Sequence, residues 1–125
     1  MRLTNILVNA AASALALGCG GSFPPPTQDL SAAQAAERSA IELGAASQPQ
    51  AQLHLALAQE QMTKARAAMK DGDNERADGL LLRARSDAEL AIALTRDQSA
   101  KTEAQKATVQ SNAQKTTNLN QGATQ

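Results

Sequence analysis

The sequence predicts an all-α protein built around an antiparallel, coiled-coil-like helical hairpin, with a shorter helix before it, a flexible N-terminal tether and a disordered C-terminal tail. Three observations predict this class. Alanine, which has the highest intrinsic helix propensity, outnumbers Leu, Ile, Val and Phe together after residue 18. Apolar residues recur at spacings of three and four on both sides of the turn-forming residues 71–74. Large apolar residues are few, which favours helices with thin seams over a thick globular core.

The segment before Cys19 has the layout of a secretory signal peptide. Arg2 is its only charged residue, and an apolar stretch follows that is too short for the roughly 20 residues of a bilayer-spanning helix. Because Ala16, Leu17 and Gly18 directly precede the cysteine, the segment resembles a bacterial lipoprotein signal. That resemblance implies cleavage before Cys19, which would become the lipidated first residue. Alanine and leucine stand here in the reverse of the preferred order.

Cys19 is the only cysteine, so a disulfide within the chain is excluded. The roles open to it are a buried thiol, half of an intermolecular disulfide, or an attachment point. Its neighbours at 20–26, with two glycines, a serine and three prolines, lack a helical or strand period and predict a tether. A tether suits attachment, because acyl chains hold one end in a membrane while the domain stands clear of it.

The helical body is predicted to begin with a helix at residues 31–44. Ser31 and Gln34 have the spacing of a capping box, and Gly44 ends the apolar pattern. A second helix is predicted to begin near Gln48, where Ser47 and Gln50 repeat the capping spacing and Pro49 falls in the first turn.

The hairpin is predicted from the seam that its two helices share. Asp73 is expected to cap the helix after the turn. Pairing about this turn sets Met62 near Ala84 and Ala58 near Asp87 or Ala88. The residues expected to form the seam are Leu55, Met62, Met69, Leu81, Ala84 and Ala88.

Five further apolar residues do not fit this seam and predict a second strip on the hairpin that needs cover. The helix at 31–44 is the nearest candidate, and self-association or a partner protein is the alternative. The last helix is expected to end near residue 108, followed by a disordered polar tail. The strip consists of Leu53, Leu57, Leu82, Ile92 and Leu94.

The predicted organisation of the whole chain has four parts. They are a signal peptide at 1–18, the lipidated cysteine and tether at 19–30, the helical domain at 31–108 and the tail at 109–125.

Composition and motifs argue against catalysis and against metal, cofactor or nucleic-acid binding. The 12 basic and 12 acidic residues balance, and there is one Phe and no Trp or Tyr, so neither a phosphate-binding patch nor a base-stacking platform is expected. His54 is the only histidine and is expected to be an ordinary, partly exposed residue. The acidic run from Asp71 lacks the Gly and Glu of a calcium loop, because Arg76 and Leu82 occupy those positions. We therefore expect no catalytic residues, metal site, cofactor, small-molecule substrate or nucleic-acid partner.

Several segments resemble one family. The runs "AERSAIELGAA", "GDNERA" and "SDAELA", together with the cysteine motif, resemble the bacterial lipoproteins that carry domain of unknown function 4398. Asn74 stands where that family usually has an aromatic residue. The resemblance implies a helical envelope protein and supplies no activity.

The function expected from the sequence is that of a membrane-anchored bacterial envelope lipoprotein with a structural or protein-interaction role and no catalytic activity. The hairpin is the expected surface for a protein partner or for self-association. The alternative is a tetratricopeptide-like or holdase-like helical adaptor. Gly20, rather than Asp, follows the cysteine, which by resemblance to enteric sorting favours the outer membrane, facing the periplasm.

Overall fold

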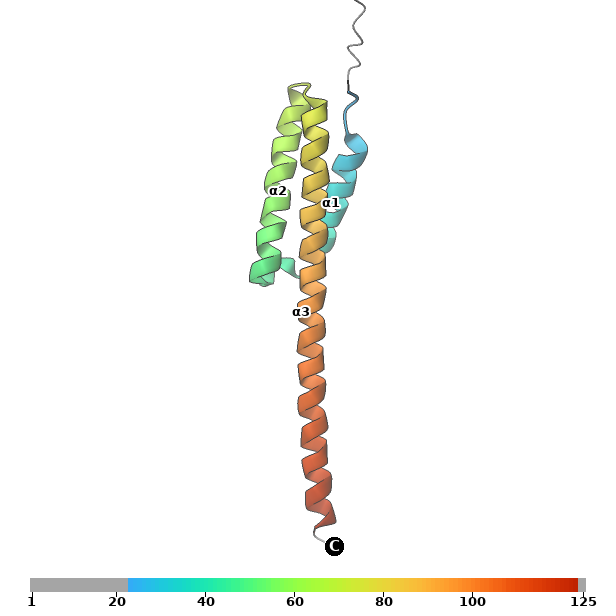
Figure 1. Cartoon of the computed structure of the whole chain (residues 1–125), viewed down its shortest axis with the longest axis vertical. Helices are drawn as coiled ribbons and strands as arrows, with labels where there is room; N and C mark the ends of the chain where they lie inside the picture. Colours follow the sequence, from blue (N-terminus) through green and yellow to red (C-terminus); the bar gives the residue numbers. More distant parts are fainter. Residues whose placement is uncertain (1–22, 124–125) are drawn as a thin grey trace, which may run out of the picture.

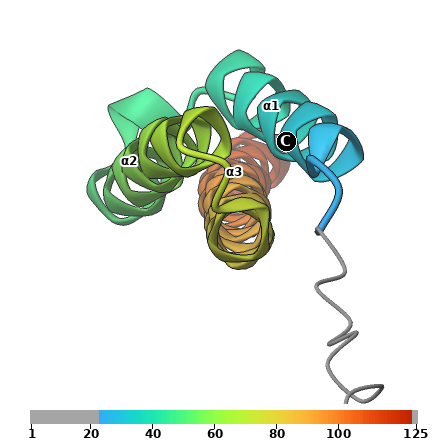
Figure 2. The same cartoon turned by 90° about the horizontal axis from the view of Figure 1, so that it is seen from above.

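The computed structural model describes residues 23–123, which form three α-helices and one short 3-10 helix (Figure 1). The elements are α1 (Thr27–Glu42), η1 (Ala45–Ser47), α2 (Pro49–Lys70) and α3 (Asn74–Gly122). No strand occurs in this part of the chain. The predicted all-α class, with an antiparallel hairpin and a shorter preceding helix, is confirmed. Both α1 and α2 lie against the first half of α3 (Figure 2), and the second half of α3 extends beyond them.

The hairpin turn follows the sequence-based expectation. Gly72 has φ +80°, a left-handed conformation that L side chains rarely adopt. The backbone N–H of Asp73 donates to the carbonyl of Ala68 at 2.9 Å, which closes the end of α2. The Asp73 carboxylate then accepts from the backbone N–H of Arg76 at 3.3 Å and caps α3.

The predicted capping boxes are wrong, whereas the predicted proline position is confirmed. α1 begins at Thr27, four residues before Ser31, because Pro26 fixes its own φ near the helical value and its carbonyl accepts from the N–H of Leu30 at 3.1 Å. Residues 27–30, which the sequence assigns to the tether, are therefore helical. α2 begins at Pro49 with no side-chain cap at all.

The C-terminal boundary also differs from the expectation. The sequence predicts a helix end near residue 108 and disorder beyond it, but α3 continues through Gly122 with its side chains exposed. No Pro or Gly interrupts the chain between Gly79 and Gly122. Threonine hydroxyls in this half donate to carbonyls four residues earlier, so these polar residues are accommodated within the helix.

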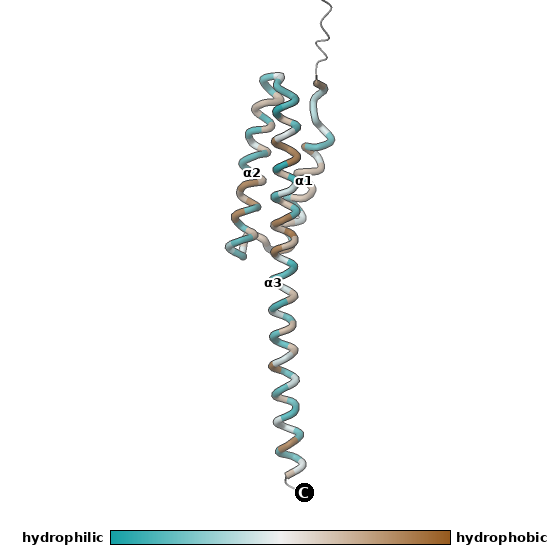
Figure 3. The backbone as a smooth tube through the Cα atoms, viewed as in Figure 1, coloured by the Kyte–Doolittle hydropathy of each residue, from teal (hydrophilic) through white to brown (hydrophobic). Residues whose placement is uncertain are grey.

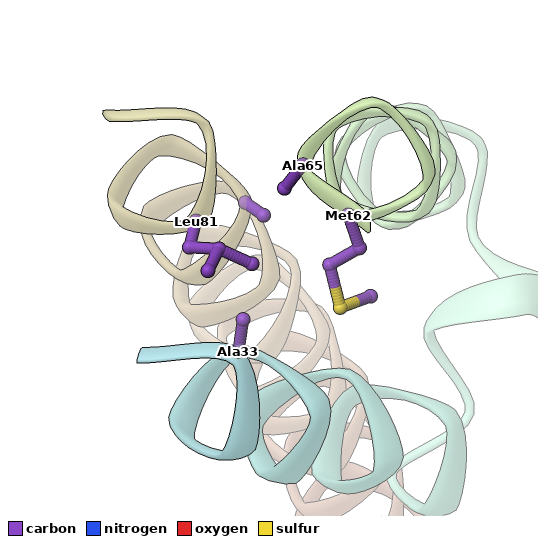
Figure 4. Close-up of a cluster of buried hydrophobic side chains, with 5 residues drawn as sticks. Ala33, Met62, Ala65 and Leu81 are labelled. Carbon is purple, nitrogen blue, oxygen red and sulfur yellow. The ribbon is translucent and has the colours of Figure 1, made fainter. Parts of the chain in front are cut away.

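The core consists of two clusters, and all three α-helices contribute to both. The upper cluster, which Figure 4 shows, lies nearer the hairpin turn in sequence, and the lower cluster includes Ala45 of η1. Alanines supply most of the buried positions, so the helix backbones approach closely. The buried members are Ala33, Met62, Ala65, Leu81 and Ala84 in the upper cluster, and Ala40, Ala45, Ala51, Leu55 and Ala91 in the lower.

The second apolar strip is only partly covered. Ile92 and Leu94 pack against the lower cluster, which α1 and η1 help to close. Leu53 and Leu82 remain 58% and 51% exposed. Hydropathy along the backbone follows this distribution (Figure 3), because the apolar positions concentrate where the three helices meet and become sparse along the second half of α3.

Candidate functional site

The predicted seam residues lie in the core. Leu55, Met62, Leu81, Ala84 and Ala88 are buried, and Met69 is half-buried against the upper cluster. These side chains hold the hairpin together and do not face solvent. The predicted signal and attachment residues Arg2, Ala16, Leu17, Gly18 and Cys19 lie outside the described residues.

A polar cluster bridges α2 and α3 beside the seam. The Asp87 carboxylate on α3 contacts two α2 side chains that lie two helical turns apart. His54 Nδ1 lies 2.9 Å from Asp87 Oδ1, and Gln61 Nε2 donates to Asp87 Oδ2 at 2.6 Å. The side chains of His54 and Asp87 are 27% and 19% exposed. One carboxylate therefore links two successive parts of α2 to α3.

Sequence reasoning missed this cluster, although a usable signal was present. His54 was expected to be an ordinary residue, and the paired register placed Asp87 near Ala58. His54 and Gln61 are separated by seven residues, so they lie on the same side of α2, one before and one after Ala58. An acidic residue that faces the midpoint of such a pair can reach both of them.

The cluster faces away from α1. Gln59 Nε2 donates to Glu37 Oε1 at 2.9 Å, which shows that α1 runs along the Gln59 side of α2. Gln61 is two residues further on, about 200° around the helix, so it lies on the opposite flank of the hairpin. We call this side the open flank. A shallow groove along it is lined by Gln61, Leu82, Arg83, Ser86, Asp87 and Leu90.

A second polar contact ties the start of the described chain to the hairpin turn. Asn74 Nδ2, in the first turn of α3, donates to the backbone carbonyl of Phe23 at 2.8 Å. Pro26 is buried just beyond this contact. Asn74 Oδ1 is buried with no hydrogen-bond partner among the described residues. At this position an amide serves as a polar clamp, where the family that the sequence resembles usually has an aromatic ring.

Removing the Asp87 carboxylate should weaken the hairpin measurably. We expect Asp87→Ala to lower the free energy of unfolding by about 1–2 kcal/mol, because two hydrogen bonds to a half-buried charged group are lost at once. Asp97→Ala is the matched control. It breaks one exposed ion pair with Lys101 within α3, and we expect a loss of no more than about 0.5 kcal/mol. Urea unfolding followed by circular dichroism measures both values, and equal losses would contradict a special role for Asp87.

Other features of the surface are ordinary for a helical protein. In the described part of the chain, three exposed ion pairs join residues four apart. In one of them, the hydrogen bond from Arg85 to Glu89 raises the pKa of the guanidinium above its usual value. Among residues 23–123, no group of three His, Cys, Asp or Glu side chains could hold a metal ion. Within the same residues, no helix combines the length and apolarity needed to cross a membrane.

Comparison with known proteins gives one positive result. The sequence profile of the family described as Domain of unknown function (DUF4398) matches residues 28–107. The match runs from the start of α1 into the second half of α3 and includes the hairpin, the open flank and Asn74, whereas Phe23 precedes the matched residues. Neither the curated proteins nor the solved structures give a match.

Proposed function

The chain belongs to the DUF4398 family, a domain of unknown function, and from this premise we propose that it is a lipid-anchored protein of the bacterial envelope. In this proposal Cys19 carries the lipid, and the helical body is a non-catalytic scaffold for protein contacts. The motif around Cys19 supports the anchor, and the long α3 supports the role of a scaffold.

The observation that carries the proposal is the clamp between Asn74 and Phe23. It holds the start of the described chain beside the hairpin turn, while α3 ends at the opposite end of the long axis (Figure 1). Cys19 precedes Phe23 by only four residues. A lipid at Cys19 would therefore set the turn near the membrane. Helix α3 has 49 residues and is therefore about 73 Å long, so the C-terminal end of α3 would stand well away from the bilayer.

The open flank is the proposed contact surface of the anchored scaffold. It presents two exposed leucines, Leu82 at 51% and Leu90 at 42%, beside the Asp87 cluster. Apolar side chains next to oriented polar groups suit the binding of another protein's helix. The same leucines favour the second candidate function, a holdase-like adaptor for other envelope proteins. Because Gly20 follows the cysteine, we place the anchored protein at the outer membrane, facing the periplasm.

Intact-mass measurement of membrane-extracted protein tests the anchor. We expect a chain that begins at Cys19 and carries added acyl groups. The Cys19→Ser variant should keep residues 1–18 and carry no acyl mass. A wild-type chain without lipid would overturn the anchor proposal, whatever the open flank binds.

One double variant and one control variant distinguish a scaffold from an adaptor. Leu82→Ser with Leu90→Ser should abolish cross-linking to specific envelope proteins if the open flank is the contact surface. Leu53→Ser, which changes a leucine that is 58% exposed on α2 and is not part of the groove, is the matched control. Capture of many unrelated unfolded proteins by the wild type would favour the adaptor instead.

A further inference from the structure

The buried residues of α3 form a single stripe with heptad spacing. They are separated by alternating steps of four and three residues, and they are Ala77, Leu81, Ala84, Ala88, Ala91 and Thr95. This is the face on which α1 and α2 pack. Continued at the same spacing into the second half of the helix, the stripe passes through Gln98, Thr102, Gln105, Val109, Asn112, Thr116 and Leu119. We call these seven residues the C-terminal stripe.

The cover over this face stops where α2 begins. A shallow hollow at the start of α2 is lined by Pro49 and Ala51 from α2 and by Leu94 and Lys101 from α3. Thr102 is half-buried, and every residue from 103 to 123 is exposed. The stripe of residues that is packed against α1 and α2 in the first half of α3 thus continues, at the same spacing, into a second half that neither of these helices covers.

The C-terminal stripe differs from the rest of this exposed half in two ways. The large apolar residues of this half, Val109 and Leu119, are 68% and 74% exposed, and both lie on the stripe. The charged residues all lie off it, at Lys101, Glu103, Lys106 and Lys115. A helix surrounded only by water needs no charge-free face, whereas a helix that packs against another does.

The low intrinsic stability of the second half of α3 as a single helix also favours a packing partner. Residues 98–122 contain many Thr, Asn and Ser residues, whose helix propensity is low. At the start of this half, the exposed pair between Asp97 and Lys101 adds only a few tenths of a kcal/mol. Single helices of this length and composition are marginal in water, so packing must supply the missing stability.

We propose that the C-terminal stripe is the interface between two copies of this chain, paired antiparallel about a two-fold axis. The axis lies midway between Val109 and Asn112, so that each Val109 packs on Asn112 of the second copy. In the same register Thr102 meets Leu119 of the second copy, which shields the leucine. The buried Asn112 would fix the register, as polar residues in coiled-coil seams do. This goes beyond the proposed anchor and does not depend on it.

Charge and space both select the antiparallel direction. Parallel pairing sets Lys101 of one copy against Lys106 of the other, twice, and like charges repel at such positions. Antiparallel pairing sets Lys106 against Ala113 and Lys115 against Thr108. Antiparallel pairing also brings the end of the second copy's α3 to the start of α2 in the first copy. The second copy therefore covers the stripe on α3 from the point where α2 stops covering it. In a parallel pair, two sets of α1 and α2 would crowd one end.

Disulfide cross-linking tests the pairing and its direction. In full-length chains that carry Cys19→Ser, one preparation carries Thr102→Cys and another carries Leu119→Cys. We expect a cross-linked dimer only after the two preparations are mixed. In the proposed register Thr102 of one copy lies opposite Leu119 of the second copy. The second copy's own Thr102 is 17 residues further along its helix, a distance of about 25 Å. A disulfide needs Cα atoms within about 7 Å. Ala107→Cys mixed with Gln114→Cys, on the far side of α3, is the control and should give none.

Each other result would overturn the proposal. Cross-linked dimers within the Thr102→Cys preparation alone would indicate parallel pairing. Absence of a Thr102 to Leu119 cross-link in the mixture would exclude the interface. As a second measurement, sedimentation equilibrium should report a dimer for the Cys19→Ser chain and a monomer once Val109→Asp is added. Ala107→Asp, which adds the same charge away from the stripe, should leave the dimer intact, and equal effects of the two charges would contradict the stripe.

Discussion

Replacing Leu81 with alanine is expected to lower the free energy of unfolding by about 3 kcal/mol. Leu81 is fully buried in the upper cluster, where side chains from α1 and α2 surround it (Figure 4). Truncating a buried leucine loses its transfer free energy and leaves a cavity, and such changes cost about 2–5 kcal/mol. Three of the other four buried residues in this cluster are alanines, which have no flexible side chain that could fill the space.

Leu82 provides the matched control for this substitution. It is the next residue on the same helix but is 51% exposed, so Leu82→Ala should change the free energy of unfolding by no more than about 0.5 kcal/mol. Thermal and urea unfolding followed at 222 nm measure both variants. A loss of 3 kcal/mol corresponds to a fall of more than about 10 °C in Tm for a domain of this size. Similar losses for Leu81→Ala and Leu82→Ala would contradict the packing of the upper cluster.

The hairpin could be predicted from sequence because its determinants are local. The spacing of Leu55, Met62 and Leu81 and the turn at Gly72 each follow from a few adjacent residues, and the structure buries these side chains in one core. Starts of helices were harder to predict. At Thr27 the preceding proline replaces the side-chain cap that the Ser31 pattern suggested, since a fixed φ and a free carbonyl are enough to begin a helix.

Two other features were not predicted from the sequence, and the reasons differ. Asp87 gains its two partners only once α2 and α3 are set in register, so neither helix alone signals the cluster. The sequence predicts disorder from residue 109 onward because these residues are polar, but α3 continues through Gly122. The residues in the second half of α3 nevertheless continue the heptad spacing of the residues that are buried in the first half. This periodicity contains structural information that amino-acid composition alone does not.

A carboxylate at position 33 is expected to separate α1 from the hairpin. Ala33 is fully buried against Met62, Ala65, Leu81 and Ala84, none of which can pair with a charge. Burying the carboxylate of Ala33→Asp there would cost several kcal/mol, so the helix should leave its site instead. We expect the free energy of unfolding to fall by about 2–4 kcal/mol, the size of other large core effects.

Hydrogen exchange distinguishes this local separation from general unfolding. In Ala33→Asp, the amides of α1 should exchange much faster, while those of α2 and the first half of α3 remain the most protected. Ala35→Asp places the same charge two residues away at an exposed position and should leave α1 docked. If Ala33→Asp keeps α1 protected, the upper cluster is not closed by this helix. The cover over Met62 and Leu81 would then have to come from another chain, so a partner could bind the hairpin over the upper cluster as well as on the open flank.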